Sequence, residues 1–222
     1  MVSPERVRRA YDDLADVYAA QRSEDGPSLA ILTEFIDGLD EPTVILDAGC
    51  GQGTPVLARL TESTTAVGLD FSREQLRLAS QNAPESALAQ ADMTALPFEA
   101  GSFDAVVAYW SLIHVPNAAQ PLMLEECARV LSPGGRILVC DGTNEWAGEN
   151  PDWLDSGVEM EWDIAGASTT RRQLEDAGFS ITERWAISQD VESNGDEKVS
   201  LDPDDPDEVD YPWTFLAATF EG

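Results

Sequence analysis

The sequence contains few of the residues on which several classes of protein depend. Its 222 residues include one histidine and three cysteines. The cysteines, Cys50, Cys127 and Cys140, are odd in number and show no CxxC spacing, so we expect neither a disulfide framework nor a zinc site. One histidine and scattered cysteines offer no cluster of ligands, and no metal is therefore expected.

Long hydrophobic runs are also missing. The arginines near the start, in MVSPERVRRAYDD, are not followed by an apolar stretch, so the sequence predicts no signal peptide. No apolar stretch reaches the roughly 20 residues that a membrane-spanning helix needs. We therefore expect a cytoplasmic protein without membrane insertion, and the sequence leaves its oligomeric state open.

Positive charge is scarce. The chain has 42 Asp and Glu residues against 13 Lys and Arg, which gives a formal net charge of −29. Nucleic acid, anionic membranes and acidic substrates are disfavoured as partners, because each would meet a strongly negative surface. Lys198 is the sole lysine, and such an acid-rich, lysine-poor composition is typical of proteins that work in concentrated salt. We expect a halophilic protein, since self-repulsion is screened where the Debye length falls to about 3 Å at 1 M.

What is present is an alternation of apolar runs and amphipathic stretches over most of the length. This alternation is typical of a parallel sheet with crossover helices. We expect one α/β domain over residues 1–222, with a Rossmann-like, seven-stranded, mostly parallel sheet, an antiparallel last strand and helices on both faces. The expected strands are 43–47, 66–69, 87–91, 103–109, 136–140, 179–187 and 213–220.

Three segments depart from the alternation. Residues 1–40 predict N-terminal cap helices, the first of which begins at Ser3 and Pro4. Residues 142–167 hold three tryptophans and seven carboxylates without a basic residue, and we expect them to form a substrate-side cap. Residues 188–211 are charged and turn-rich, which predicts a solvated acidic loop.

The most informative motif is the stretch VILDAGCGQGT at residues 44–54. A buried strand there runs into three glycines spaced two apart, which let the backbone approach a ligand closely, and a helix start then offers free N–H groups. Dinucleotide sites instead use GxGxxG around a pyrophosphate. Asp47 at the strand end would repel a pyrophosphate but suits an ammonium group, so the motif disfavours a nicotinamide oxidoreductase.

Asp70 ends the second expected strand, about 20 residues past the glycines. A carboxylate in this place can accept two hydrogen bonds from ribose hydroxyls. Dinucleotide sites use the same device, so this residue alone does not discriminate between ligands. The alternative is an acidic residue that complements the dipole of the helix that follows.

Together these motifs resemble the class I S-adenosylmethionine-dependent methyltransferases, in the small-molecule branch similar to the ubiquinone/menaquinone-biosynthesis (type 11) enzymes. LDAGCGQG resembles motif I, and VGLDFSREQL the segment after it. QADMTALPFEAGSFDAVVAYWSLIHV resembles the adenine-side motif and fourth strand, and RVLSPGGRILVCDG the fifth-strand motif. The resemblance covers nearly the whole chain and is weakest over 142–167 and 190–210.

The resemblance implies S-adenosylmethionine as the cofactor. It places Asp47 near the methionine amino group, Asp70 at the ribose hydroxyls and Asp92 at the adenine N6 amino group. For the aromatic side chains that it places around the cofactor, packing in the core is the alternative. The further residues that it places there are Gly49, Gly51, Gly53, Phe71, Met93, Tyr109 and Tyr18.

The implied reaction is an in-line displacement at a methyl carbon, for which alignment and desolvation can suffice. A base becomes useful for a hydroxyl or carbon-acid acceptor, and His114 is the candidate, with a packing or positioning role as the alternative. Tyr11, Trp110 and Trp146 are the candidate acceptor-side residues. The tryptophans and carboxylates of 142–167 suit a cationic acceptor through cation–π contact, or simply pack a cap.

The predicted function is methyl transfer from S-adenosylmethionine to a small-molecule acceptor, whose attacked atom (O, N, C or S) is open. One alternative is a non-catalytic S-adenosylmethionine-binding protein, such as a regulator or an assembly subunit. Aminopropyl transfer from the decarboxylated cofactor is another, since the chain has many carboxylates that could bind a diamine.

Overall fold

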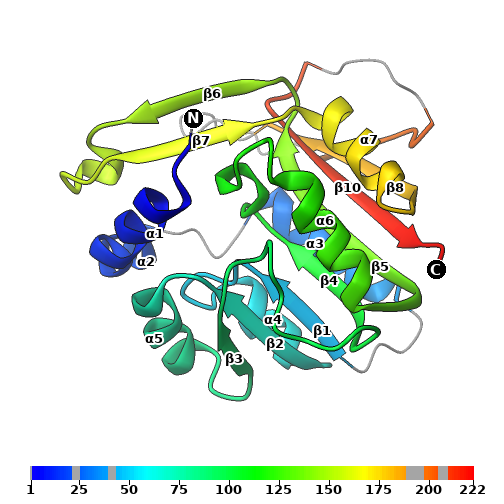
Figure 1. Cartoon of the computed structure of the whole chain (residues 1–222), viewed down its shortest axis with the longest axis horizontal. Coiled ribbons are helices and arrows are strands. Elements are labelled where there is room, and N and C mark those ends of the chain that lie inside the picture. Colours follow the sequence, from blue (N-terminus) through cyan, green and yellow to red (C-terminus); the bar gives the residue numbers. More distant parts are fainter. Residues whose placement is uncertain (1, 22–25, 40–43, 189–197, 205–209) are drawn as a thin grey trace.

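The computed structural model describes residues 2–21, 26–39, 44–188, 198–204 and 210–222. Its centre is a sheet flanked by helices (Figure 1). The strands of this sheet are β1 (Val44–Ala48), β2 (Thr65–Asp70), β3 (Ala87–Gln90), β4 (Phe103–Ala108), β5 (Leu131–Gly142), β8 (Phe179–Ile187), β9 (Lys198–Leu201) and β10 (Trp213–Phe220).

The strands lie across the sheet in the order β3-β2-β1-β4-β5-β10-β8-β9. The strands β1 to β5 pair in parallel, whereas β10 runs antiparallel to both β5 and β8. The mostly parallel sheet and its antiparallel last strand are therefore confirmed. The chain order reverses between β1 and β4, and open α/β sheets bind ligands beyond the carboxyl ends of the strands at such a point.

Within the described residues the sheet has eight strands rather than the predicted seven. The additional strand is β9, which pairs antiparallel with β8 and lies inside the segment predicted as an acidic loop. Its four residues, KVSL, are too short a pattern to predict a strand, and the edge of β8 provides the hydrogen-bonding partners that form it. Residues 189–197 and 205–209 of the predicted loop lie outside the described residues.

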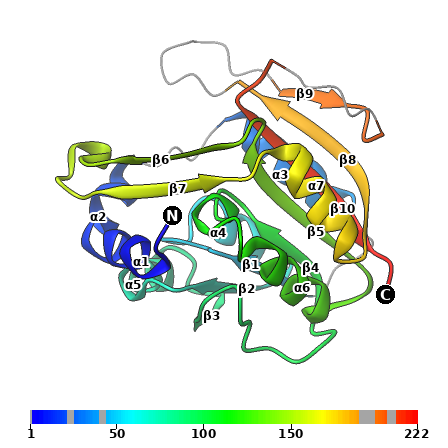
Figure 2. The same ribbon diagram turned by 45° about the horizontal axis from the view of Figure 1, so that its top comes forward.

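Helices cover both faces of the sheet, as predicted (Figure 2). Leu174 and Leu46 belong to a hydrophobic cluster on the face covered by α6 and α7, while Phe35 and Ile45 belong to a second cluster under α3 and α4 on the opposite face. Ile45 and Leu46 are adjacent in β1, so the alternation of a strand supplies both cores. None of the described helices is both long and apolar enough to cross a bilayer. The covering helices are α3 (Pro27–Asp37), α4 (Val56–Thr61), α5 (Arg73–Asn82), α6 (Gln120–Val130) and α7 (Ala167–Asp176).

The N-terminal segment forms α1 (Pro4–Asp13) and α2 (Ala15–Gln21). The hydroxyl of Ser3 accepts a hydrogen bond from the Arg6 N–H at 3.4 Å and caps α1, where the sequence predicts a helix start. Leu14 separates α1 from α2, because its φ of −108° and ψ of 10° are not helical. The remaining helix of the first 40 residues, α3, covers the sheet.

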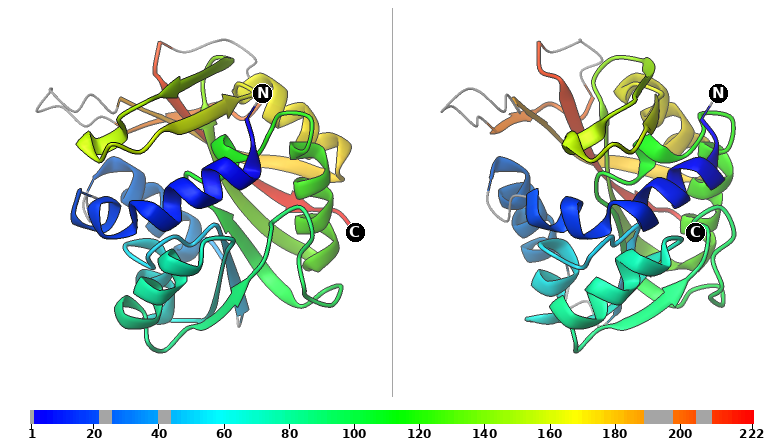
Figure 3. Two further views of the ribbon diagram at one scale, coloured as in Figure 1. Left: turned by 60° about the vertical axis from the view of Figure 1, so that its left-hand side comes forward. Right: turned by 90° about the vertical axis from the view of Figure 1, so that its left-hand side faces the viewer.

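Residues 142–167 fold largely into a hairpin outside the main sheet, in which β6 (Trp146–Asn150) pairs antiparallel with β7 (Met160–Ile164). Figure 3 shows α1 running beneath this hairpin. Met160 and Val7 pack in a third hydrophobic cluster, which joins the two elements. Since α1 also contacts α5, it is held between the hairpin and the main sheet layer.

The core under α3 provides a test of the fold. Phe35 is fully buried in the second cluster, and a Phe→Ala change at such a site removes apolar contacts and leaves a cavity. We expect Phe35→Ala to lower the free energy of unfolding by about 3–5 kcal/mol, measured by urea unfolding in molar KCl. Leu122→Ala is the control, since Leu122 is 50% exposed on α6, and we expect less than about 1 kcal/mol there. Equal effects would contradict the described core.

Candidate active site

A cavity of about 810 Å³, partly open to solvent, lies at the carboxyl-end edge of the sheet. Residues after β1, β2, β3 and β4 contribute to its wall, and α1 and α2 add Pro4, Tyr11 and Tyr18. The wall is mostly uncharged. The other lining residues are Gly49, Gly51, Asp70, Phe71, Ala91, Asp92, Met93, Thr94, Tyr109, Trp110, Ser111, His114, Val115, Pro116 and Ala119.

The glycine loop after β1 approaches the cavity closely. Gly49 and Gly51 have φ values of +82° and +53°, in the left-handed region that favours glycine, and both line the cavity. A Cβ atom at Gly49 would lie 2.4 Å from the Cβ of Ser111, so no larger residue fits there. Gly53 has a different role, because a Cβ on it would lie 3.0 Å from the Cα of Ala79 in α5. Gly53 therefore permits helix packing and does not line the cavity.

Asp70 joins the end of β2 to this loop. One oxygen of the buried Asp70 carboxylate accepts from the Gly51 N–H at 2.9 Å, and the other accepts from the Ser72 N–H at 2.8 Å. Burial raises the pKa of Asp70 to about 6, although the two N–H donors oppose the shift. The carboxylate is therefore held in a fixed orientation at the cavity wall.

Asp47 reaches a smaller adjoining cavity of about 320 Å³. This second cavity shares Tyr18, Gly49, Gly51 and Tyr109 with the larger one. Asp47 is buried at the end of β1. The two buried carboxylates thus lie along neighbouring cavities that meet at the glycine loop.

Asp92, Met93 and Phe71 form another part of the large cavity. One oxygen of Asp92 accepts from both the N–H and the hydroxyl of Thr94, at 2.8 and 2.7 Å. This contact fixes the carboxylate beside two apolar side chains. A planar ring with an exocyclic amino group would suit such a pocket.

The turn after β4 is held in an uncommon conformation. Trp110 has a φ of +59°, which is costly for a residue with a large side chain. Its ring packs edge-on against Trp213, with ring centres 4.6 Å apart. Ser111 donates to the Ala48 carbonyl at 2.7 Å and ties the turn to β1. These contacts hold Tyr109 and Trp110 against the cavity.

His114 is held by contacts on both ring nitrogens. Its Nε2 lies 2.8 Å from the hydroxyl oxygen of Tyr11, and its Nδ1 lies 3.3 Å from the backbone carbonyl of Glu161. A carbonyl can only accept, so Nδ1 carries the proton and Nε2 accepts from Tyr11. Burial lowers the pKa of His114 to about 4, and the imidazole is neutral at pH 7.

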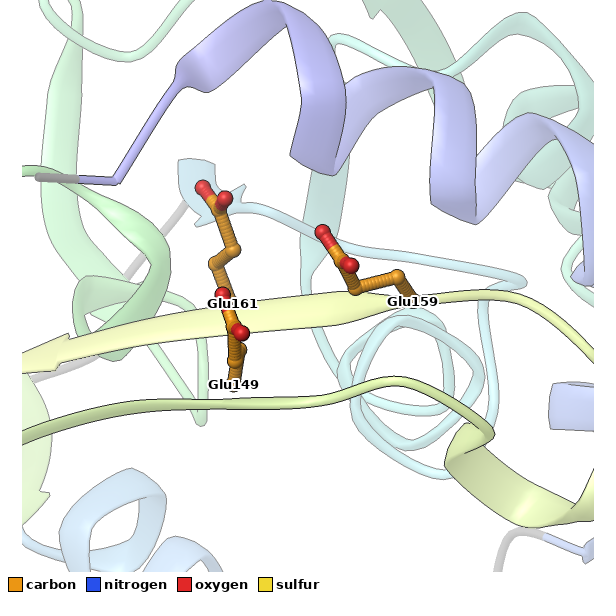
Figure 4. A group of neighbouring side chains, drawn as sticks. All are labelled: Glu149, Glu159 and Glu161. Carbon is orange, nitrogen blue, oxygen red and sulfur yellow. The ribbon is translucent and has the colours of Figure 1, made fainter.

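Charged contacts fix α1 over the cavity. Arg6 pairs with Glu159 and Glu161, and the backbone N–H of Ser3 donates to Glu161 at 2.9 Å. Figure 4 shows Glu161 on β7 and Glu159 just before it, both extending towards α1, with Glu149 of β6 beside them. Although the oxygens of these three carboxylates lie within 4.8 Å of one another, Arg6 occupies the cluster as a structural cation. The cluster therefore holds the lid-like helix in place.

The large cavity brings together eleven of the residues that the sequence indicated. Asp47 lies in the adjoining cavity, while Gly53 and Trp146 line neither. Trp146 is 51% exposed on β6 and lies over its own neighbour Gly148. Sequence reasoning missed Arg6 and Glu161, because their roles depend on the docking of α1 against the hairpin. The eleven residues are Tyr11, Tyr18, Gly49, Gly51, Asp70, Phe71, Asp92, Met93, Tyr109, Trp110 and His114.

Comparison with known proteins identifies the domain. The family profile described as a methyltransferase domain matches residues 45–135. Methyltransferase GfsG of Streptomyces halstedii is 40% identical over 105 residues, covering 44% of this chain and 37% of that protein. A tRNA (carboxymethyluridine(34)-5-O)-methyltransferase of Arabidopsis thaliana is 31% identical over 147 residues, covering 66% and 34%. A demethylmenaquinone methyltransferase of Streptomyces avermitilis is 31% identical over 149 residues, covering 65% and 64%.

The chain thus spans about a third to two thirds of the length of these curated relatives. Among solved structures, a DhpI–SAH complex has the same fold, with a TM-score of 0.71 at 19% identity over 97% of this chain and 95% of that one. Residues 45–135 therefore match a methyltransferase domain, and the chain is similar to S-adenosylmethionine-dependent methyltransferases. S-adenosylmethionine is the cofactor that this similarity indicates.

The charged side chains that line the two cavities fit S-adenosylmethionine. No arginine or lysine is among the residues that line the two adjoining cavities, whereas Asp47, Asp70 and Asp92 are. A sulfonium and an ammonium group are favoured by such a field, and a pyrophosphate is not. The side chains that line the two cavities therefore favour an adenosyl cofactor over a dinucleotide, as the sequence motif does.

The single histidine allows a direct test of its buried, neutral state. The pKa of His114 is about 4 when folded, against 6.5 for the free side chain, so the unfolded chain binds one more proton between these values. The contribution of neutral His114 to the free energy of unfolding is fully present above about pH 6.5 and is lost as the pH falls towards 4. We expect the loss in unfolding free energy between pH 7 and pH 5 to be about 1–2 kcal/mol smaller for His114→Asn than for the parent.

Urea unfolding at both pH values measures this difference. The raised pKa values of Asp70 and Asp141 act in the opposite direction, but they are common to both proteins and cancel in the comparison. An equal loss in the two proteins would contradict the neutral histidine.

Proposed function

We propose that this protein transfers a methyl group from S-adenosylmethionine to a small-molecule acceptor by in-line displacement. The observation that supports it most is that one cavity is lined both by fixed carboxylates with the glycine loop and by the uncharged side chains of Tyr11, Trp110 and His114. We assign the carboxylates and the glycine loop to the cofactor, and the uncharged side chains to the acceptor. A charged cofactor and an uncharged acceptor would meet between them.

For the cofactor, we propose Asp47 for the methionine ammonium group, Asp70 for the ribose hydroxyls and Asp92 for the adenine amino group. Each carboxylate accepts, and each target donates. Gly49 and Gly51 line both cavities without a side chain, which would let the methionine end approach the backbone closely. Phe71 and Met93 supply the apolar surface for the adenine ring.

The acceptor is proposed to be small and uncharged. The lining offers no cation that would bind an acidic group, and the formal charge of −29 would repel a nucleic acid. A tRNA methyltransferase is also among the relatives. The preference for a small acceptor over a nucleic acid therefore rests on the charge of this chain. The relative named as a demethylmenaquinone methyltransferase agrees with it.

When bound, the cofactor supplies an electrophilic methyl group. The chain's own contribution is alignment of the acceptor and exclusion of water, which together can offset several kcal/mol of the barrier. Arg6, with Glu159 and Glu161, holds α1 across the cavity. Ser111 and Trp110 fix the turn that faces the reacting groups.

The first experiment is calorimetric titration with S-adenosylmethionine, S-adenosylhomocysteine and NAD, in dilute buffer and in 2 M KCl. We expect micromolar binding of both adenosyl compounds and none of NAD. Transfer of a tritiated methyl group is then measured with five compounds, identified by mass. They are 1,4-dihydroxynaphthalene, catechol, benzylamine, thiophenol and N,N-dimethylbenzylamine. Binding without transfer to any of them would favour the alternative of a non-catalytic S-adenosylmethionine-binding protein.

We also propose that the protein works in concentrated salt. With 42 acidic and 13 basic residues, repulsion between carboxylates destabilises the folded chain at low ionic strength, and salt screens that repulsion. The titration in two buffers tests this, since tighter binding in 2 M KCl supports it and equal or weaker binding opposes it.

The raised pKa of Asp70, about 6, gives a pH test of its role. The ionised carboxylate is a stronger hydrogen-bond acceptor than the protonated group, which also loses an acceptor site to its own proton. Affinity for S-adenosylhomocysteine therefore rises with pH through 6 and falls by up to about tenfold per unit below it. We expect Asp70→Asn to bind at least about tenfold more weakly at pH 7.5 and to lose this pH dependence. Titration between pH 5 and pH 8 measures both effects.

The matched control is Glu99→Gln, on an exposed loop outside the cavity. It should keep the parent's affinity and pH dependence. A pH-independent affinity in the parent would overturn the assignment of Asp70.

A further inference from the structure

Tyr11 and His114 come from segments 103 residues apart and meet at the wall of the same cavity. Since Nδ1 of His114 donates to the Glu161 carbonyl, the Nε2 lone pair points at Tyr11. The Tyr11 hydroxyl donates to it across 2.8 Å. A phenol that donates its proton in this way keeps oxygen lone pairs that can accept a hydrogen bond from a third group.

The position of the Tyr11 oxygen is well defined. Its ring makes edge-on contacts with Tyr18, His114 and Trp153, with ring centres 5.5, 5.2 and 5.9 Å apart. Tyr11 therefore belongs to an aromatic wall built from α1, α2, the turn after β4 and the hairpin. An acceptor in the uncharged part of the cavity would meet this oxygen at a fixed place.

The carboxylates of the large cavity are engaged elsewhere. Both oxygens of Asp70 accept from backbone N–H groups of Gly51 and Ser72, and Asp92 accepts from Thr94. These contacts hold both carboxylates in the part of the cavity assigned to the cofactor. The neutral imidazole behind Tyr11 is thus the base best placed for the acceptor.

We propose that Tyr11 and His114 relay a proton away from a hydroxyl group of the acceptor. This inference rests on the proposed methyl transfer and names its substrate class, neutral compounds methylated on oxygen. The acceptor oxygen bonds to the methyl carbon as the carbon–sulfur bond breaks, and that bonding pair goes to sulfur. The hydroxyl proton passes to Tyr11 while the Tyr11 proton passes to Nε2 of His114. The positive charge of the sulfonium ends on the imidazolium, so atoms and charge balance.

The weak basicity of His114 is compatible with this relay. An oxygen that is gaining a methyl group while still protonated becomes a strong acid, so a weak base suffices to take its proton. The low pKa of His114, about 4, then favours loss of the proton to water when the product leaves. The pair returns to its starting state without a further reactant.

The first test needs no acceptor. Because the chain has one histidine, its ring nitrogens give unambiguous ¹⁵N signals after histidine labelling. We expect a protonated Nδ1 and an unprotonated, hydrogen-bonded Nε2, and Tyr11→Phe should shift the Nε2 signal downfield while preserving the tautomer. A proton on Nε2, or an Nε2 signal that ignores the substitution, would overturn the relay.

The second test is single-turnover methyl transfer to 1,4-dihydroxynaphthalene. Tyr11→Phe keeps the aromatic ring, so we expect the rate to fall about 100-fold while the affinity for S-adenosylhomocysteine changes less than about twofold. His114→Asn should lose about as much, and the double variant no more than either, because the two groups act as one unit. Arg9→Gln, on the exposed side of α1, should leave the rate unchanged.

The outcomes separate this inference from the proposed function. Methylation of benzylamine or thiophenol but neither hydroxyl compound would overturn the oxygen-acceptor class and leave methyl transfer intact. A rate unaffected by Tyr11→Phe would overturn the relay alone. Tight cofactor binding without methylation of any compound would count against the proposed function and the relay together.

Discussion

The hydrogen bonds between the end of β2 and the glycine loop after β1 hold the rest of the site in place. The Leu69 carbonyl accepts from Gly49 at 2.7 Å, and the Asp70 carboxylate accepts from Gly51 and Ser72. A single carboxylate therefore links the glycine loop, the strand end and the start of α5. Because neighbouring parallel strands end at one edge, this junction also defines where the two cavities meet.

Much of the fold could be predicted from local patterns. The strands 179–187 and 213–220 match their predicted ranges, since each is an apolar run bounded by turn residues. The strand β9 and the hairpin of β6 and β7 could not be predicted in this way. The sequences of β7 (MEWDI) and β9 (KVSL) alternate apolar and polar residues over only five and four positions, and that of β6 (WAGEN) does not alternate. Such short segments become strands through pairing with a partner segment that the sequence does not reveal.

Most of the predicted site residues line the two cavities, but their contacts could not be predicted from the sequence. Asp47 and Asp70 lie at the carboxyl ends of β1 and β2, and Asp92 follows β3, so topology alone brings them to one edge of the sheet. Gly53 has the same spacing as its neighbours in the motif, and only its contact with Ala79 distinguishes a packing glycine from a cavity-lining one. The hydrogen bond between Tyr11 and His114 depends on how α1 docks, which no periodicity encodes.

The hairpin formed by residues 142–167 has a wider consequence. Its part between β5 and α7, residues 143–166, contributes neither strand nor helix to the main sheet and the helices that cover it. It nevertheless positions α1 and, through the Glu161 carbonyl, the ring of His114. The placement of α1 and of His114 thus depends on a stretch of sequence separate from the one that forms the glycine loop and the ends of β1 and β2. Exchange of this one hairpin would alter the positions of Tyr11 and His114 while the glycine loop and the strand ends stay as they are.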